Sequence, residues 1–228
     1  MNVAIIVAAG QGTRMGHNID KIFLEVAGKP VVAHTWAAFE ACGDIGEIVL
    51  VVRSGMESAF NDLAKVCRFR KPYKCVPGGK ERQDSVWNGL QALSSTAEFV
   101  AIQDAARPCT TPELISLTLA AANRTGAAVA AQKVPDTIKE SEDGQIISRH
   151  LDRSRLWSVQ TPQTFRVSII LKALQSVREK GLIVTDDTAA CELIGQKVEF
   201  VESCQPNPKI TVPGDLSYLE ILLRKNSQ

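Results

Sequence analysis

Short apolar runs alternate along the chain with longer stretches in which apolar residues recur at helical spacing. The first run, residues 3–8, is continuously apolar and ends at glycines, which is typical of a strand buried on both faces. Further strands are predicted at residues 47–52, 73–76, 98–102, 127–132 and 198–201. Helices are predicted at residues 30–42, 56–66, 82–93, 111–124, 168–179, 188–194 and 216–223.

The order of these elements predicts an α/β fold. Strands that alternate with helices form a mostly parallel sheet with helices on both faces. In such sheets the ligand crevice lies at the carboxyl ends of the strands. We therefore expect the functional residues just after residues 8, 76 and 102.

Residues 134–159 interrupt this alternation. They contain Pro135, a polar turn at 140–144 and an alternating segment at 145–150, and this pattern predicts a β-arm that projects from the sheet. Because an isolated hairpin is only marginally stable in water, we expect the arm to pack on a second subunit. No linker divides the remainder, so residues 1–228 are expected to form a single domain.

Composition and charge exclude several classes of function. The 228 residues are 45% hydrophobic and 22% charged, which is ordinary for a globular domain. Lys and Arg number 26 against 25 Asp and Glu, so the net charge of +1 offers no broad basic field for a nucleic acid or a membrane surface. The chain has neither C-x-x-C nor H-E-x-x-H, which disfavours a zinc enzyme. The first apolar run is too short to span a membrane and lacks signal-peptide features, which predicts the cytoplasm.

The loop after the first strand is the first candidate site. It reads Ala8-Ala9-Gly10-Gln11-Gly12-Thr13-Arg14-Met15-Gly16, and Lys21 follows. Glycines after a buried strand let backbone N–H groups approach an anion closely, although the spacing fits neither a P-loop nor a dinucleotide-binding motif. Arg14 and Lys21 add two cations, which suits a polyphosphate in nucleotidyl transfer. The alternative is a tight turn with two solvated cations.

Residues 78–86 form a second motif, in which two glycines leave a strand and a helix begins. We expect this helix start to form a site for a base or ribose, with Ser85 as the side chain that contacts the nucleotide. The alternative is an ordinary capped helix start that involves Asp84 or Ser85.

Residues 104–108 form a third motif, at the end of the strand at 98–102. Asp104 is expected to help hold Mg²⁺ beside a triphosphate or to accept a hydrogen bond from a sugar hydroxyl. Arg107 is expected to bind an anionic substrate group. The alternative is an Asp–Arg pair that braces the loop. Later in the chain, the adjacent carboxylates Asp186 and Asp187 are not predicted to form a general acid–base pair, because neighbours in a helix cap rarely face one substrate.

Taken in order, these motifs resemble the 2-C-methyl-D-erythritol 4-phosphate cytidylyltransferases of the non-mevalonate isoprenoid pathway, from about residue 3 to residue 220. The motifs are Ala8-Ala9-Gly10-x-Gly12-x-Arg14-Met15, Gly78-Gly79-x-x-Arg82-x-x-Ser85-Val86, Asp104-Ala105-Ala106-Arg107-Pro108, Leu156-Trp157-x-x-Gln160-Thr161-Pro162-Gln163-x-Phe165 and Thr185-Asp186-Asp187. The resemblance implies a Rossmann-like nucleotidyltransferase fold, a homodimer formed through the arm, and Mg²⁺-dependent transfer of CMP from CTP to the polyol phosphate with release of pyrophosphate.

The resemblance also implies roles for single residues. Arg14 and Lys21 would stabilise the transition state at the α-phosphorus. The nucleotide would be bound by Ala8, Ala9, Gly10, Gly12, Gly79, Ser85, Asp104 and Ala105. The polyol phosphate would be oriented by Arg107, Thr137, Arg153, Thr161, Thr185 and Lys209. Because Thr137 and Arg153 lie on the arm, they would serve the partner's active site.

Three positions depart from the family pattern. Asp20 precedes Lys21 where a proline is common, Gln103 precedes Asp104 where histidine is frequent, and residues 204–208 form an unusual approach to Lys209. Two other functions are alternatives. A ribitol 5-phosphate cytidylyltransferase has closely related loops. An NADP-dependent reductase, with Arg53 on the 2′-phosphate, conflicts with the glycine spacing.

Overall fold

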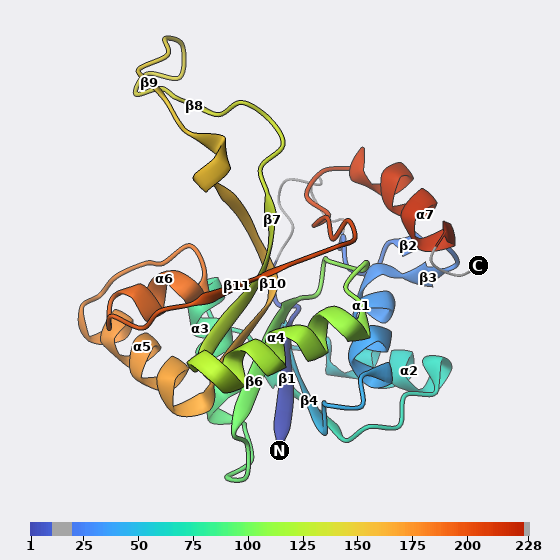
Figure 1. Cartoon of the computed structure of the whole chain (residues 1–228). Coiled ribbons are helices and arrows are strands. Elements are labelled where there is room, and N and C mark those ends of the chain that lie inside the picture. The colour runs from blue at the N-terminus through green and yellow to red at the C-terminus, as the bar shows by residue number, and fades with distance from the viewer. Residues whose placement is uncertain (11–19, 226–228) are drawn as a thin grey trace.

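The computed structural model describes residues 1–10 and 20–225 and contains a central sheet of seven strands, in the order β11-β7-β10-β6-β1-β4-β5 (Figure 1). The sheet strands are β1 (Asn2–Val7), β4 (Glu47–Val52), β5 (Tyr73–Pro77), β6 (Phe99–Asp104), β7 (Ala127–Lys133), β10 (Trp157–Arg166) and β11 (Glu199–Glu202). Two short antiparallel pairs lie outside it, namely β2 (Glu25–Val26) with β3 (Lys29–Pro30) and β8 (Lys139–Glu140) with β9 (Arg149–His150). All sheet pairings are parallel except those of β10.

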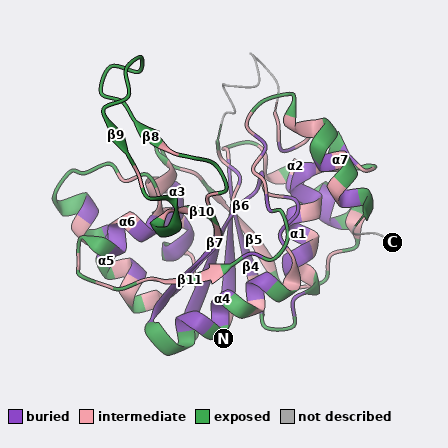
Figure 2. Cartoon of the chain, turned by 45° about the horizontal axis from the view of Figure 1, so that its top comes forward, coloured by how far each residue is buried: buried purple, intermediate pink, exposed green. Residues whose placement is uncertain are grey.

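Helices cover both faces of this sheet (Figures 1 and 2). They are α1 (Val31–Ala41), α2 (Glu57–Cys67), α3 (Arg82–Gln91), α4 (Pro112–Thr125), α5 (Val167–Glu179), α6 (Asp187–Glu192) and α7 (Asp215–Lys225). Alternate residues of β1 enter different cores: Ala4 and Ile6 pack with α1, α2, α4 and α7, whereas Val3 and Ile5 pack with α3, α5 and α6. The structure therefore confirms the predicted α/β fold with a mostly parallel sheet.

Strand β10 is absent from the sequence prediction. It contains Pro162 among polar residues such as Gln160 and Thr161, and both features argue against a central strand. The strand nevertheless runs antiparallel between β6 and β7, and its register against β7 shifts between Val159 and Gln163, around the proline. Residues 160–165 of the strand are buried, and polar side chains among them have partners inside the protein, such as Gln132 for the amide of Gln160 and Thr118 for the hydroxyl of Thr164.

The projecting arm extends from the end of β7 to the start of β10 and therefore comprises residues 134–156, with β8, β9 and a short 3-10 helix (Arg153–Arg155). Residues 157–159, which the sequence pattern placed at the end of the arm, belong to β10. Every residue from 139 to 150 is exposed (Figure 2). No helix within residues 1–10 and 20–225 is long and apolar enough to cross a membrane.

Backbone hydrogen bonds join the loops that follow three strands at one edge of the sheet. The N–H groups of Ala8 and Gly78 donate to carbonyls of β4, at 2.7 and 2.8 Å. The N–H of Ala105 donates to a carbonyl of β1, at 3.1 Å. The loop after β1, the glycine turn after β5 and the end of β6 are thereby held side by side, as the parallel topology predicts.

Candidate active site

A pocket of about 530 Å³ opens at this edge of the sheet. Its walls come from the loop after β1, the turn before α3, the end of β6 and the segment that leads to α7. The predicted residues that line it are Ala8, Ala9, Gly10, Lys21, Gly79, Ser85, Asp104, Ala105 and Lys209. Residues from five separate parts of the chain thus meet in one cavity. Gly12 and Arg14 lie outside the described residues.

The two glycines of the turn before α3 are required by close packing. A Cβ atom added to Gly78 would lie 2.2 Å from the Cβ of Ala9, and one added to Gly79 would lie 2.3 Å from the Cβ of Asp84. Both distances are far shorter than a normal carbon–carbon contact of about 3.5–4.0 Å. Glycine therefore lets the turn press directly against the first loop and form a wall of the pocket.

Ser85 fixes the shape of this turn. Its hydroxyl accepts a hydrogen bond from the N–H of Gly79 at 3.1 Å and donates to the carbonyl of Glu81 at 3.2 Å. Glu81 caps α3 in a capping box with Asp84, so the helix start is an ordinary capped one. Ser85 also lines the pocket. The two interpretations of this motif, as a capped helix and as a pocket wall, are therefore compatible.

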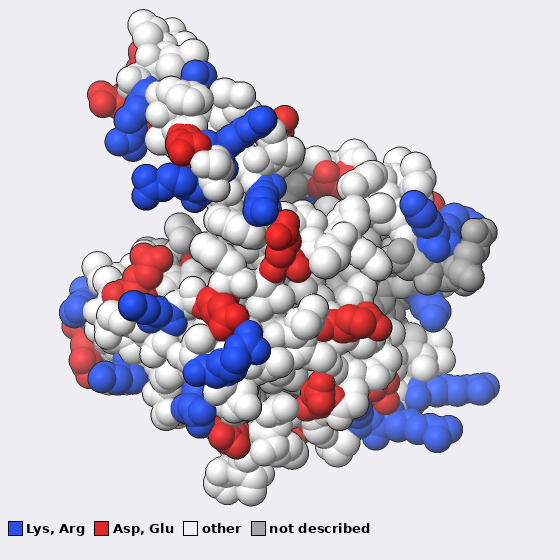
Figure 3. Space-filling model, viewed as in Figure 1, with Lys and Arg blue, Asp and Glu red and all other residues white. Residues whose placement is uncertain are grey.

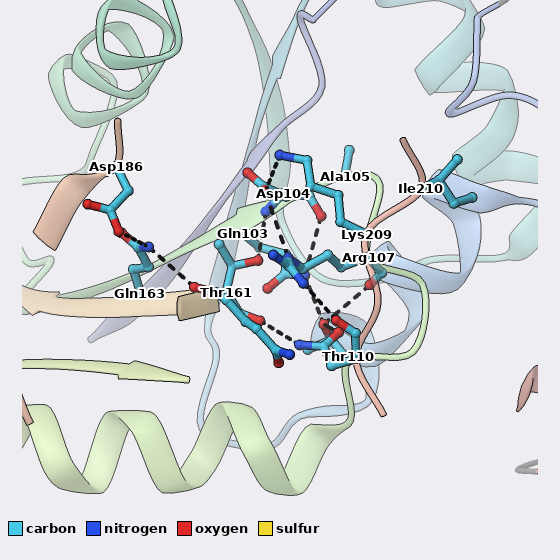
Figure 4. A network of polar contacts seen from close by, with 12 residues as sticks. Gln103, Asp104, Ala105, Arg107, Thr110, Thr161, Gln163, Asp186, Lys209 and Ile210 are labelled. Atoms are coloured by element: carbon cyan, nitrogen blue, oxygen red, sulfur yellow. Dashed lines mark hydrogen bonds and ion pairs between the residues drawn. The ribbon is translucent and has the colours of Figure 1, made fainter. Parts of the chain in front are cut away.

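Asp104 lies at the centre of a cluster of charges (Figure 4). One carboxylate oxygen accepts from the ammonium of Lys209 at 2.7 Å, and the other accepts from the Nε of Arg82 at 3.3 Å. Burial alone would raise the pKa of Asp104, but Arg82, Lys209 and Arg107 outweigh it and hold the pKa well below its usual range. The carboxylate therefore stays ionised at the wall of the pocket.

Arg82 joins Asp104 to a second buried carboxylate, that of Asp187. Its Nη1 donates to Oδ2 of Asp187 at 2.8 Å. Burial raises the pKa of Asp187 although Arg82 opposes the shift, and the two carboxylates together raise the pKa of Arg82 despite its burial. No role was predicted for Arg82 or Asp187, because 105 residues separate them and only the folded sheet brings them together. The neighbouring Asp186 is an ordinary N-cap that accepts from the N–H of Ala189 at 2.9 Å.

Arg107 and Thr161 lie behind Asp104 rather than among the residues that line the pocket. Nη1 of Arg107 donates to the carbonyl of Asn207 at 2.7 Å, and its Nε lies 3.8 Å from Asp104. The hydroxyl of Thr161 is buried and accepts from the N–H of Asp104 at 3.1 Å. Arg107 thus has the geometry of the loop-bracing alternative, and direct contact of Arg107 or Thr161 with a substrate stays a prediction.

The ammonium of Lys21 reaches the segment that carries Lys209. It donates to the carbonyl of Ile210 at 3.0 Å, which ties the loop after β1 to the chain that leads to α7. The preceding residue, Asp20, forms an ion pair with Arg53 at the end of β4. Burial raises the pKa of Asp20, against the opposing effect of Arg53. An ion pair thus anchors the position at which proline was expected.

Comparison with known proteins identifies the family. The family model described as 2-C-methyl-D-erythritol 4-phosphate cytidylyltransferase matches residues 2–225. The chain belongs to this family. It is 42% identical to the enzyme of that name from Desulforamulus reducens over 226 residues, which cover 99% of this chain and 97% of the relative. The relative of the same name from Caldanaerobacter subterraneus is also 42% identical, over 99% of this chain and all of its own length.

Solved structures agree with this assignment to the 2-C-methyl-D-erythritol 4-phosphate cytidylyltransferases. The structure of 4-diphosphocytidyl-2C-methyl-D-erythritol synthase from Anaerococcus prevotii superposes with a TM-score of 0.87 at 30% identity, over 98% of this chain and 96% of that one. The cytidylyltransferase from Thermus thermophilus superposes with a TM-score of 0.79 at 33% identity, over 98% of this chain and 100% of that one. The family resemblance found in the sequence and the predicted fold are therefore confirmed.

Three further residues expected from the cytidylyltransferase family also lie away from the pocket lining. Thr137 is exposed on the arm, where Arg153 donates through Nη1 to the carbonyl of Pro135 at 2.7 Å. Thr185 is exposed just before α6. In a single chain these residues do not complete the cavity, so their predicted roles depend on ligand binding or on a second subunit.

Proposed function

We propose that this enzyme transfers CMP from CTP to 2-C-methyl-D-erythritol 4-phosphate and releases pyrophosphate. The observation that carries the proposal is the pocket at the carboxyl edge of the sheet, in which Lys209 and Arg82 contact the ionised Asp104 and Lys21 lines the same cavity. A cavity lined by several cations suits a triphosphate and a phosphate monoester together. Family membership over nearly the whole chain supports the same substrates.

The reaction is a direct in-line displacement. A phosphate oxygen of the polyol phosphate attacks the α-phosphorus of CTP, the bond between the α-phosphorus and the bridging oxygen breaks, and that oxygen leaves with pyrophosphate. No protein nucleophile is required, because a phosphate monoester dianion already carries the attacking electron pair. Lys21, together with Arg14 by the family resemblance, offsets the negative charge that develops during the displacement.

The residues of the pocket fit a Mg²⁺ ion that accompanies the triphosphate. Asp104 and Glu81 are the acidic side chains among the described residues that line the cavity, and no cluster of three metal-ligating side chains occurs in the described part of the chain. Mg²⁺ is commonly bound by one or two carboxylates together with phosphate oxygens. Asp104 would hold the ion directly or through water, and the chemistry supplied would be neutralisation of phosphate charge.

A homodimer formed through the arm is the proposed assembly. The arm projects away from the sheet and carries several basic side chains (Figures 1 and 3). Ile146 and Ile147 are 72% and 63% exposed near its tip, which gives a partner an apolar surface to cover. Thr137 and Arg153 would then serve the pocket of the partner subunit. The cytoplasmic location expected from the sequence stays a prediction.

Pyrophosphate release tests the substrate directly. The enzyme is incubated with CTP, Mg²⁺ and either 2-C-methyl-D-erythritol 4-phosphate or ribitol 5-phosphate, and NADPH oxidation is followed in a parallel sample. We expect release with the methylerythritol substrate at a kcat/KM at least about 100-fold above that with ribitol phosphate, a ratio within reach of polar-group recognition. Preferred turnover of ribitol phosphate would replace the proposed substrate, and NADPH oxidation without pyrophosphate release would replace the reaction class.

A further inference from the structure

Asp187 is a buried acidic residue that has no role in the in-line displacement proposed above. The residue is completely buried, at 0% exposure. Oδ2 accepts the hydrogen bond from Arg82, whereas Oδ1 is buried with no hydrogen-bond partner among the described residues. A buried carboxylate with an unsatisfied oxygen is costly for folding. Such a group is more often found where function requires it than where stability alone is at stake.

We propose that Asp187 and Arg82 form a positioning pair for nucleotidyl transfer, in which Asp187 holds the guanidinium of Arg82 across the wall of the pocket beside Asp104. Arg82 lines the pocket, whereas Asp187 does not. Asp187 therefore acts through Arg82 and is not itself a catalytic residue. The inference rests on the proposed function and names two residues that control its nucleotide site.

The geometry of the guanidinium supports this role. Nη1 faces Asp187 at 2.8 Å while Nε faces Asp104 at 3.3 Å, so one planar group bridges two carboxylates. The shorter bond is the one to Asp187, and the bond from Arg82 to Asp104 is longer than the 2.7 Å bond from Lys209. Asp187 is thus the closer partner of Arg82. Because the hydrogen bond from Arg82 to Asp104 is long, the Asp104 carboxylate can still accept a hydrogen bond from a ribose hydroxyl or bind a hydrated cation.

The backbone fixes Asp187 in place independently of Arg82. Its N–H donates to the side-chain oxygen of Gln163 at 3.0 Å. The side-chain amide of Gln163 in turn donates to Asp186 at 3.1 Å (Figure 4). Gln163 belongs to β10, which pairs directly with β6, the strand that ends at Asp104. The start of α6 and the end of β6 are therefore held by the same strand, so the spacing between the two carboxylates is set by the sheet.

The balance of charges around Asp104 predicts what happens when the charge of Asp187 is removed. Arg82, Arg107 and Lys209 contribute three positive charges, and Asp104 and Asp187 contribute two negative ones. In Asp187→Asn, Arg82 has Asp104 as its remaining carboxylate partner in the cluster. We expect the guanidinium to move toward Asp104 and to compete with the ligands that Asp104 serves.

The experiment compares Asp187→Asn with Glu192→Gln, a control that removes an exposed carboxylate from the same helix, α6, away from the pocket. We expect Asp187→Asn to lower kcat/KM for CTP by about 10–100-fold, the usual effect of losing a residue that holds a ligand-binding side chain. CTP–Mg²⁺ affinity by calorimetry should fall as well, whereas Glu192→Gln should stay within about twofold of wild type in both measurements. Wild-type kinetics in Asp187→Asn, or an equal loss in Glu192→Gln, would overturn the proposal.

Arg82→Lys completes the test, since lysine keeps the charge but cannot bridge two carboxylates as a planar fork. If the pair acts as a unit, adding Asp187→Asn to Arg82→Lys lowers kcat/KM by less than about twofold further, whereas independent roles would give multiplied losses. If Asp187→Asn does not fold, Arg82→Lys carries the test alone, and wild-type kinetics there refute the pair. Calorimetry measures how the two substitutions change CTP affinity even if the wild-type enzyme releases no pyrophosphate with the proposed substrate. That outcome would refute the proposed substrate but not the Arg82–Asp187 pair.

Discussion

Gly78→Ala is the substitution that tests most directly how the pocket is built. The added Cβ would lie 2.2 Å from the Cβ of Ala9 and 3.1 Å from the hydroxyl oxygen of Ser85. To restore a normal carbon–carbon distance of about 3.5–4.0 Å, the turn and the first loop must separate by about 1.3–1.8 Å. Ala9 and Ser85 both line the pocket, so this separation occurs within the nucleotide site itself.

Two magnitudes follow from this displacement. Overpacking of this kind typically costs about 1–3 kcal/mol of folding free energy. For a chain of this length, each kcal/mol lowers the thermal midpoint by about 2–4 °C, so we expect a decrease of about 2–12 °C. A misplacement of about 1 Å in a catalytic site can reduce the rate about 100-fold, and we expect at least that loss in kcat/KM for CTP.

The assay measures initial rates of pyrophosphate release over a range of CTP concentrations, together with thermal unfolding. Gly43→Ala is the matched control, because an added Cβ there meets no atom within 4 Å and the residue lies in an exposed turn. The double variant Ala9→Gly, Gly78→Ala removes the main clash and should recover part of the lost activity. If Gly78→Ala has wild-type kinetics, or if the double variant is no better than the single one, close packing does not shape this site.

Three further predictions address charge and reactivity. Lys21→Ala should lower kcat by about 100–1000-fold and change CTP affinity far less, as expected for a group that stabilises the transition state, and unchanged turnover would contradict its role. The pKa of Asp104 is lowered by folding, so its contribution to stability is complete above the unfolded value of about 3.9 and is lost as the pH falls below it. In urea, the free energy of unfolding of the wild type should therefore exceed that of Asp104→Asn by a constant amount from pH 7 to about pH 4 and by a smaller amount at lower pH. A difference that grows on acidification would contradict the lowered pKa of Asp104. Iodoacetamide at pH 8 should label the exposed Cys204 in the native protein and leave Cys191 unmodified, because burial raises the pKa of Cys191 to about 12, and peptide mass spectrometry would reveal any labelling of Cys191 that contradicts this.

The pattern of apolar residues was sufficient to predict most of the sheet, because parallel strands that are buried on both faces are continuous apolar runs. Strand β10 could not be predicted in this way, because its buried positions are occupied by residues such as Gln160, Thr161, Gln163 and Thr164. These side chains are accommodated by specific partners, for example Thr164, whose hydroxyl donates to that of Thr118 in α4 at 2.9 Å. Such partners exist only once the tertiary structure has formed.

Part of the candidate site could likewise be predicted from the sequence and part could not. Glycine turns and strand-end residues such as Gly79 and Asp104 could be located from their place after apolar runs, and the structure gathers them in one pocket. The pairing of Arg82 with Asp187 could not be predicted, because each residue has a plain local explanation, one in the first turn of α3 and the other beside an N-cap. Sequence motifs identified which loops meet, whereas the buried ion pairs depend on side-chain geometry.

The wide spacing of the partners of Asp104 has a consequence for fragments of the protein. Its carboxylate is held by Arg82, 22 positions earlier, and by Lys209, 105 positions later. A premature stop codon between Glu202 and Lys209 would keep all seven strands of the central sheet in the product while removing a cation from the pocket. Among the described residues, the cavity lining extends from Val7 to Lys209, so any fragment shorter than this span lacks part of the site.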